Sequence, residues 1–230
     1  MKIRIKFRKY GVMKFIGHLD MMRYFQKAMR RAEIDICYSE GFSPHQIMSF
    51  AAPLGVGVTS DGEYLDIEVH RSPSTAEALC ILNETMVDGV EITGYVKLPD
   101  DAKTAMSIVA AADYELSFKE GYTPVATVEQ FADGIAKHFT KPAQVLITKQ
   151  TKKSEKVMDL KQLVYDFQVS EKVREDGIAV PCFYLMVSTG STDNLKPELV
   201  VEHLFAAMGL SYDANAIQIH RKDVYAADGD

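Results

Sequence analysis

The chain has 230 residues, of which 47% are hydrophobic, 10% aromatic and 25% charged, values typical of a globular protein. This composition excludes a disordered chain, a collagen-like repeat and a disulfide-rich miniprotein, and the length allows one large domain or two compact ones. A net charge of −6 argues against a protein whose whole surface coats nucleic acid.

The first elements are predicted from hydrophobic periodicity. Residues 2–8 alternate apolar and basic side chains, which indicates a half-buried strand. Over 18–33 the apolar side chains recur at three- and four-residue steps, which predicts a helix with one buried face. We then expect strands at 34–38, 63–70 and 90–98, a helix at 72–86, and a turn-rich segment at 41–57.

The second half repeats this order of elements after a polar joint at 99–104. We expect strands at 112–118, 144–148, 157–160, 163–169, 180–188 and 216–221, helices at 124–138 and 197–208, and a polar turn at 149–156. Strand, helix, strand, strand, helix, strand is the order of a split βαβ sandwich. The sequence therefore predicts an α+β fold of two ferredoxin-like (βαββαβ) domains with mainly antiparallel sheets, 1–100 and 101–230, the second with an extra hairpin.

Charge is unevenly distributed along the chain. Residues 1–48 carry ten Lys or Arg and four Asp or Glu, a balance of +6, which leaves −12 for the other 182 residues. The three cysteines lie more than 40 residues apart, so they offer no zinc or iron–sulfur spacing and predict reduced thiols. The amino end lacks the apolar core of a signal peptide and no stretch resembles a membrane span. We therefore expect a cytoplasmic protein without membrane association.

The first predicted helix carries a basic face opposite its apolar one. Cations grouped in this way can hold a polyanion, because each neutralised phosphate releases counterions. A solvated helix face without a ligand is the alternative. The basic residues of this face are Arg23, Lys27, Arg30 and Arg31.

Basic residues also share one face of the first predicted strand. If that face is exposed, the positive surface continues from the helix onto the sheet. In a ferredoxin-like domain, single-stranded RNA commonly lies on the sheet face opposite the helices, where aromatic side chains stack on the bases. The strand residues are Lys2, Arg4, Lys6 and Arg8.

The segment 38–57 concentrates glycine, proline and aromatic residues between two strands. Glycines permit a close backbone approach to a ligand and prolines fix the chain, so we interpret the segment as an ordered binding loop. A hairpin loop that packs its own aromatic side chains is the alternative. Its candidate ligand-binding residues are Tyr38, Gly41, Phe42, Pro44, His45 and Phe50.

His18 and Asp20 begin the first helix, and with His45 they could form an acid–base or metal cluster if the loop folds back. Two histidines and one carboxylate are an incomplete metal-ligand set, and the helix dipole already accounts for Asp20. We therefore expect no metal, no cofactor and no catalytic group. GxGxxG, Walker A, nucleophile-elbow and HExxH motifs do not occur.

Several segments of the first seventy residues form one pattern. They are Phe15-Ile-Gly-His18-Leu-Asp20, Ala28-Met-Arg30-Arg31-Ala32, Tyr38-Ser-Glu-Gly41-Phe42-Ser-Pro44-His45, Ser49-Phe50-Ala-Ala-Pro53-Leu-Gly55-Val-Gly57 and Glu63-Tyr-Leu-Asp66. With these motifs the chain resembles the radical SAM-linked proteins, a bacterial family of unassigned function. The resemblance covers about residues 2–70. Where family members often carry a proline and a basic residue after the loop histidine, this chain has Gln46 and Ile47, which weakens the expectation of a phosphate contact there.

The resemblance implies an accessory role beside a radical SAM enzyme, such as presenting RNA for modification. We therefore expect a non-catalytic, RNA-binding partner of such an enzyme. On this hypothesis the helix cations contact phosphates, Tyr38, Phe42 and Phe50 shape the site or stack on bases, and His18, Asp20 and His45 orient the ligand. Two alternatives stay open. One is an enzyme that uses His18, Asp20 and His45 on a small substrate, and the other is a docking adaptor for the radical SAM partner.

Overall fold

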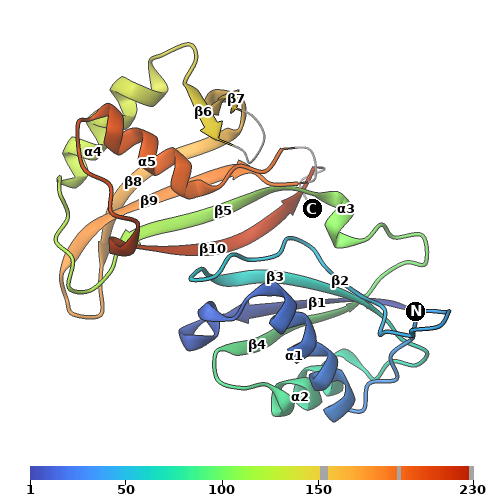
Figure 1. Ribbon diagram of the computed structural model, residues 1–230. Coiled ribbons are helices and arrows are strands. Elements are labelled where there is room, and N and C mark those ends of the chain that lie inside the picture. The colour runs from blue at the N-terminus through green and yellow to red at the C-terminus, as the bar shows by residue number, and fades with distance from the viewer. Residues whose placement is uncertain (151–154, 191–192, 228–230) are drawn as a thin grey trace. The chain divides into compact units, whose positions relative to one another are not determined.

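The computed structural model describes residues 1–150, 155–190 and 193–227, and within them it has five α-helices and mainly antiparallel strands (Figure 1). The expected mixed α+β class is confirmed. The chain divides into two compact units, one made of residues 1–110 and 221–230 and the other of residues 111–220. We call them unit 1 and unit 2. The division lies ten residues after the expected boundary, and the end of the chain belongs to unit 1.

Strand β1 (Lys2–Lys9) is the central strand of unit 1. Its odd-numbered side chains are buried and its even-numbered ones half-buried, as the alternation predicts. β1 pairs antiparallel with β3 (Thr59–Glu68) on one side and with β4 (Val90–Lys97) on the other. The short β2 (Met48–Phe50) pairs antiparallel with β3.

Two helices cover the odd-numbered face of β1, α1 (His18–Arg31) and α2 (Thr75–Thr85) (Figure 1). Both lie where the sequence predicts a helix, and Ser74 caps α2 by accepting a hydrogen bond from the Glu77 amide at 3.3 Å. A third helix, α3 (Ala105–Ile108), has no counterpart in the predicted elements. The core between sheet and helices contains Ile3, Ile5, Phe7, Phe25, Met29, Leu65, Ile67 and Leu82.

The strand expected at 34–38 is wrong. Only isolated bridges form there, between Ile36 and Val69 and between Tyr38 and Gln46. The amide of Ile34 bonds to the Met29 carbonyl at the end of α1, and the Ile36 amide bonds to the Ile34 carbonyl, so these groups are unavailable to a ladder. The strand that follows α1 in the chain and pairs with β3 is β2, which begins ten residues after Tyr38.

Unit 2 is built on β5 (Val109–Phe118), which pairs antiparallel with β9 (Ala179–Ser188), which in turn pairs antiparallel with β8 (Val164–Val173). β6 (Leu146–Gln150) and β7 (Glu155–Asp159) pair antiparallel close to the strands expected at 144–148 and 157–160, and residues 151–154 of the expected polar turn lie outside the described residues. The other elements are α4 (Val128–Ile135), a π-helical turn (Ala136–Thr140) and α5 (Pro197–Ala207).

Aromatic rings form the core of unit 2. Phe131 of α4 lies 4.9 Å from Phe183 of β9 and 5.1 Å from Phe205 of α5, measured between ring centroids. Thr127 and Gln130 form a reciprocal capping box that starts α4. The predicted helix over 124–138 is therefore shorter at its start, and its last part is π-helical.

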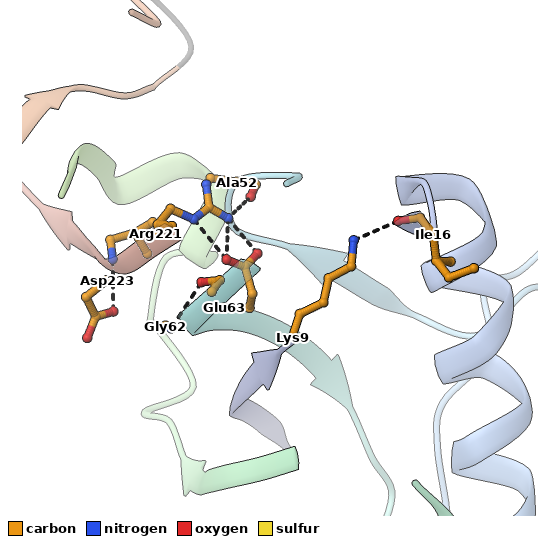
Figure 2. A network of polar contacts seen from close by, with 9 residues as sticks. Lys9, Ile16, Ala52, Gly62, Glu63, Arg221 and Asp223 are labelled. Atoms are coloured by element: carbon orange, nitrogen blue, oxygen red, sulfur yellow. Dashed lines mark hydrogen bonds and ion pairs between the residues drawn. The ribbon is translucent and has the colours of Figure 1, made fainter. Parts of the chain in front are cut away.

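The last strand, β10 (Ile217–Ala226), ends in unit 1 and is held there by buried charges. The Arg221 guanidinium is 3% exposed and donates to both carboxylate oxygens of Glu63 at 2.5–2.9 Å and to the Ala52 carbonyl at 2.6 Å (Figure 2). Lys6 Nζ donates to Asp223 Oδ2 at 2.6 Å. A Cβ at Gly62 would lie 2.7 Å from the Asp223 Cα, so glycine is required for this close approach.

Replacing Arg221 with Met should destabilise the protein strongly, because it leaves the Glu63 carboxylate buried and without its cation. We expect a loss of about 3–5 kcal/mol in the free energy of unfolding, measured by urea denaturation. The double variant Glu63→Met, Arg221→Met should recover part of this loss, since neither charge then remains buried. Lys97→Met, which removes an exposed cation from β4, should change stability by less than about 0.5 kcal/mol. A similar small change in Arg221→Met would contradict the role assigned to the ion pair.

Candidate functional site

Helix α1 presents two chemically different faces. Met21, Phe25, Ala28 and Met29 are buried at helical spacing against the sheet. The four predicted ligand-binding cations on the opposite face are all exposed, and the two in the last turn also suit the negative end of the helix dipole.

The charges on this face are little neutralised. Arg23 pairs with Asp20 at 3.0 Å, one turn earlier on the same helix, but both side chains are about two-thirds exposed and such a pair is worth about 0–1 kcal/mol. Arg30 and Arg31 donate to the uncharged carbonyls of Gln26 and Thr85. Within the described ranges, no hydrogen bond or ion pair engages Lys27. The face therefore keeps most of its positive charge, and we call it the α1 basic face.

The expectation that this positive surface continues onto the strand is wrong, because the β1 cations are paired. Arg4 binds Asp66 at 2.8 and 3.0 Å, and Asp66 is itself buried rather than on an exposed strand face. Lys6 binds Asp223, and Lys2 donates to the carbonyls of Asp100 and Ala102. Arg8 contacts Asp61 and Glu91.

The loop over 38–46 is ordered by its own hydrogen bonds. Ser39 accepts a hydrogen bond from the His45 amide at 3.1 Å, and the Ser39 amide donates to the His45 carbonyl at 2.8 Å. The side chains of these two residues also bond, at 2.9 Å from Oγ to Nδ1. Gly41 has φ +106°, a conformation that favours glycine. Phe42 is fully exposed, Tyr38 is 49% exposed, and Pro44 is also exposed.

One backbone carbonyl joins this loop to the α1 basic face. Gln26 O accepts hydrogen bonds from Gln46 Nε2 at 3.2 Å and from Arg30 Nε at 3.3 Å. Gln46 Nε2 also contacts the Tyr38 hydroxyl at 3.4 Å. The aromatic loop and the cations of α1 therefore lie beside each other, although they come from separate segments of the sequence.

Phe50 and His18 lie in different surroundings from the exposed loop. Phe50 is 5% exposed and packs against Phe7 and Phe25 with ring centroids 6.0 and 5.7 Å away, so it belongs to the core and its ring is not available to stack on a base. The His18 ring lies edge-on to Phe50 at 5.3 Å. Both residues line a small cavity of about 20 Å³ together with Lys9 and Glu63.

His18, Asp20 and His45 each have separate partners. His18 contacts Phe50, Asp20 pairs with Arg23, and His45 bonds to Ser39 and Ser43. In the part of the chain that the structure describes, no three His, Cys, Asp or Glu residues lie together in a way that could hold a metal ion. No contact among these three residues is observed that would support the hypothesis of an enzyme acting on a small substrate.

The structure contains a cluster of buried charged side chains that the sequence analysis does not predict. Its members are Lys9, Glu63 and Arg221 (Figure 2). Lys9 Nζ donates to the Ile16 carbonyl at 2.7 Å. Burial lowers the pKa of Lys9 below its ordinary value of 10.5, although the neighbouring Glu63 acts in the opposite direction. A signal was present in the sequence, since Lys9 continues the inward series Ile3, Ile5, Phe7.

The lowered pKa of Lys9 predicts a stability that rises with pH in the alkaline range. Between the lowered pKa and about 10.5 the unfolded chain holds a proton that the folded chain has released, so raising the pH favours folding. Lys9→Met lacks this contribution. The difference in unfolding free energy, wild type minus Lys9→Met, should therefore increase as urea titrations move from neutral pH towards about 10.5. Lys97→Met, which removes an exposed lysine, serves as the control, and a constant or falling difference for Lys9→Met would contradict the assignment.

No helix in the described parts of the chain is long and apolar enough to cross a membrane. A family model described as an uncharacterized protein conserved in bacteria (DUF2344) matches residues 2–197. No curated protein matches the chain.

Proposed function

The chain belongs to this family of uncharacterized bacterial proteins, and we propose that its unit 1 binds single-stranded RNA through the α1 basic face and the loop over 38–46. The observation that carries the proposal is that the basic residues of β1 and those of α1 differ in their partners. The strand cations are paired with acids or carbonyls, whereas the helix cations stay exposed with mostly uncharged partners.

Exposed cations of this kind suit a phosphate backbone. Each phosphate that a single strand places on a cation releases counterions and contributes a slope of about −0.7 to the dependence of log K on log salt concentration. An acidic protein that keeps four cations together at its surface attracts a polyanion to that place rather than to the whole surface.

The aromatic loop supplies the second half of the interaction. Stacking of a base on an aromatic side chain is worth about 1–3 kcal/mol and tolerates any sequence. Phe42 and Tyr38 are exposed, and the contact of Gln46 with Gln26 holds the loop beside α1. Phosphates on the helix and bases on the loop are therefore compatible with one bound strand.

We also propose that each unit is a ferredoxin-like sandwich. The strand order β4-β1-β3 with β2 on β3 in unit 1 supports this, as does the order β5-β9-β8 in unit 2. In the described residues α1 and α2 pack on the sheet of unit 1, which also has the short α3, and unit 2 contains α4 and α5. The radical SAM partner is a further part of the proposal. It rests on the motif resemblance, and the exposed interface suits an accessory protein that presents RNA to an enzyme.

Changing Arg23, Lys27 and Arg30 together to Glu should abolish RNA retention. The three substitutions reverse the α1 basic face without touching its buried side. Binding of a fluorescent single-stranded RNA, measured by anisotropy at several salt concentrations, should be lost and its salt dependence should become flat.

The matched control changes three exposed lysines elsewhere, Lys97, Lys103 and Lys141, to Glu, which gives the same change in net charge. This control should retain most of the RNA binding of the wild type. Equal losses in both triple variants, or unchanged binding in the α1 variant, would reject a local interface.

A docking adaptor is the second candidate function, and an exposed apolar patch favours it. Val12, Phe15, Leu19 and Val56 are 62–74% exposed. Two contacts bring their segments together, since the Gly57 amide donates to the Lys14 carbonyl at 2.8 Å and a Cβ at Gly17 would lie 3.8 Å from Val56. Such a surface suits a protein partner better than a phosphate backbone.

Purification from native cells distinguishes RNA binding from direct docking of a protein. If the patch docks an enzyme, Phe15→Ser with Leu19→Ser should remove the co-purifying protein, and nuclease treatment should leave it in place in the wild type. Val96→Ser, a similar loss of an exposed apolar side chain on β4, serves as control. Loss of the co-purifying protein on nuclease treatment would reject direct docking in favour of RNA as the bridge.

A further inference from the structure

A cleft of about 310 Å³ lies in unit 1, separate from the α1 basic face. Arg4 of β1 and Tyr64 of β3 line it, together with both ends of α3, Val109 and the end of β10. Arg4 and Tyr64 belong to the sheet face opposite α1 and α2, because the inward face of β1 is its odd-numbered one. The volume is at the lower end of the range of small-molecule sites, about 300–1,000 Å³.

The charges at this cleft balance. Arg4 forms its two-bonded ion pair with Asp66, and Asp223 pairs with Lys6. A charged ligand would bring a further, unpaired charge to these half-buried ion pairs, which is energetically unfavourable. The cleft therefore suits an uncharged ligand.

Arg4 retains hydrogen-bonding capacity beyond this pair. Its Nε and Nη2 donate to Asp66, and Nη2 also donates to the Lys103 carbonyl. Nη1 has no acceptor among the residues in the described ranges. Because Asp66 also accepts the Ala105 amide at 2.6 Å, the guanidinium is held in place by a carboxylate that is itself fixed. Arg4 can therefore direct two N–H groups at a ligand oxygen or ring nitrogen.

The remaining walls are apolar or aromatic. Tyr64 and Tyr225 contribute rings, and Ile108, Val109 and Val224 contribute aliphatic surface. Flat aromatic ligands gain most from such walls, because they place two faces against apolar atoms while their edge meets the polar group.

We propose that this cleft binds a flat, uncharged heterocycle of nucleobase size, with a ring nitrogen or carbonyl oxygen accepting hydrogen bonds from Arg4. The ligand is either a free nucleoside or one base of an RNA strand, since both offer the same ring. The proposal does not depend on RNA binding at the α1 basic face.

Fluorescence of 2-aminopurine riboside tests the cleft, because the chain contains no tryptophan that would obscure the signal. The wild type should quench the riboside saturably. Ala226→Phe, which fills the cleft from β10, should weaken binding by about tenfold or more, equivalent to about 1.4 kcal/mol. The control Ala76→Phe, an equal enlargement at an exposed position of α2, should bind as the wild type does.

A second variant guards against misfolding of Ala226→Phe. Arg4→Lys keeps a cation beside Asp66 but removes the Nη1 donors, and should weaken riboside binding in a protein that still unfolds cooperatively on heating. Absence of saturable quenching by the wild type overturns the proposal. Unchanged affinity in both Arg4→Lys and Ala226→Phe also overturns it.

A second experiment, with 2-aminopurine inside a short single-stranded RNA, distinguishes a free nucleoside from a base of an RNA strand as the ligand. Quenching of both probes, with the strand signal lost in Ala226→Phe, supports a base of a strand as ligand. Quenching of the riboside alone supports a free nucleoside. The variant with Arg23, Lys27 and Arg30 changed to Glu should still quench the riboside, so failure of the α1 interface is observed separately from failure of the cleft.

Discussion

The buried ion pair between Arg221 and Glu63 is the contact on which the organisation of unit 1 depends. It joins positions 158 residues apart, and both side chains are almost completely removed from water. Taking two charges out of water is unfavourable unless each finds its partner with good geometry, and here the guanidinium also meets the Ala52 carbonyl. The pair therefore specifies where the end of β10 belongs.

The pairing of charges within unit 1 separates structural cations from available ones. Arg4 and Lys6 form ion pairs on the sheet, and the partner of Lys6 is Asp223, which lies in the last ten residues of the chain. The α1 cations have at most an exposed partner on their own helix or a carbonyl. A local balance of +6 in residues 1–48 thus contains two populations of basic residues with different environments.

The spacing of apolar residues in the sequence is sufficient to predict the elements that have one regularly buried face. Alternation located β1, and helical spacing located α1 and its exposed basic side. The burial of Phe50 and the pairing of Lys6 with Asp223 depend on contacts across long stretches of sequence, so no local period carries them. Lys9 is an intermediate case, because its position in the alternation indicated burial, whereas its carboxylate neighbour lies 54 residues further along. The candidate loop was located by its glycines and prolines, but its attachment to Gln26 required the structure.

The return of residues 221–226 to unit 1 has a consequence for synthesis on the ribosome. The amino-terminal part of a protein usually folds while the rest is still being translated. Here Glu63 is translated long before Arg221, so the nascent unit 1 spends the translation of all of unit 2 with an acidic group awaiting its cation. Until Arg221 emerges, the Glu63 carboxylate lacks the cation that compensates its charge in the folded protein, so unit 1 is completed only after unit 2 has been translated.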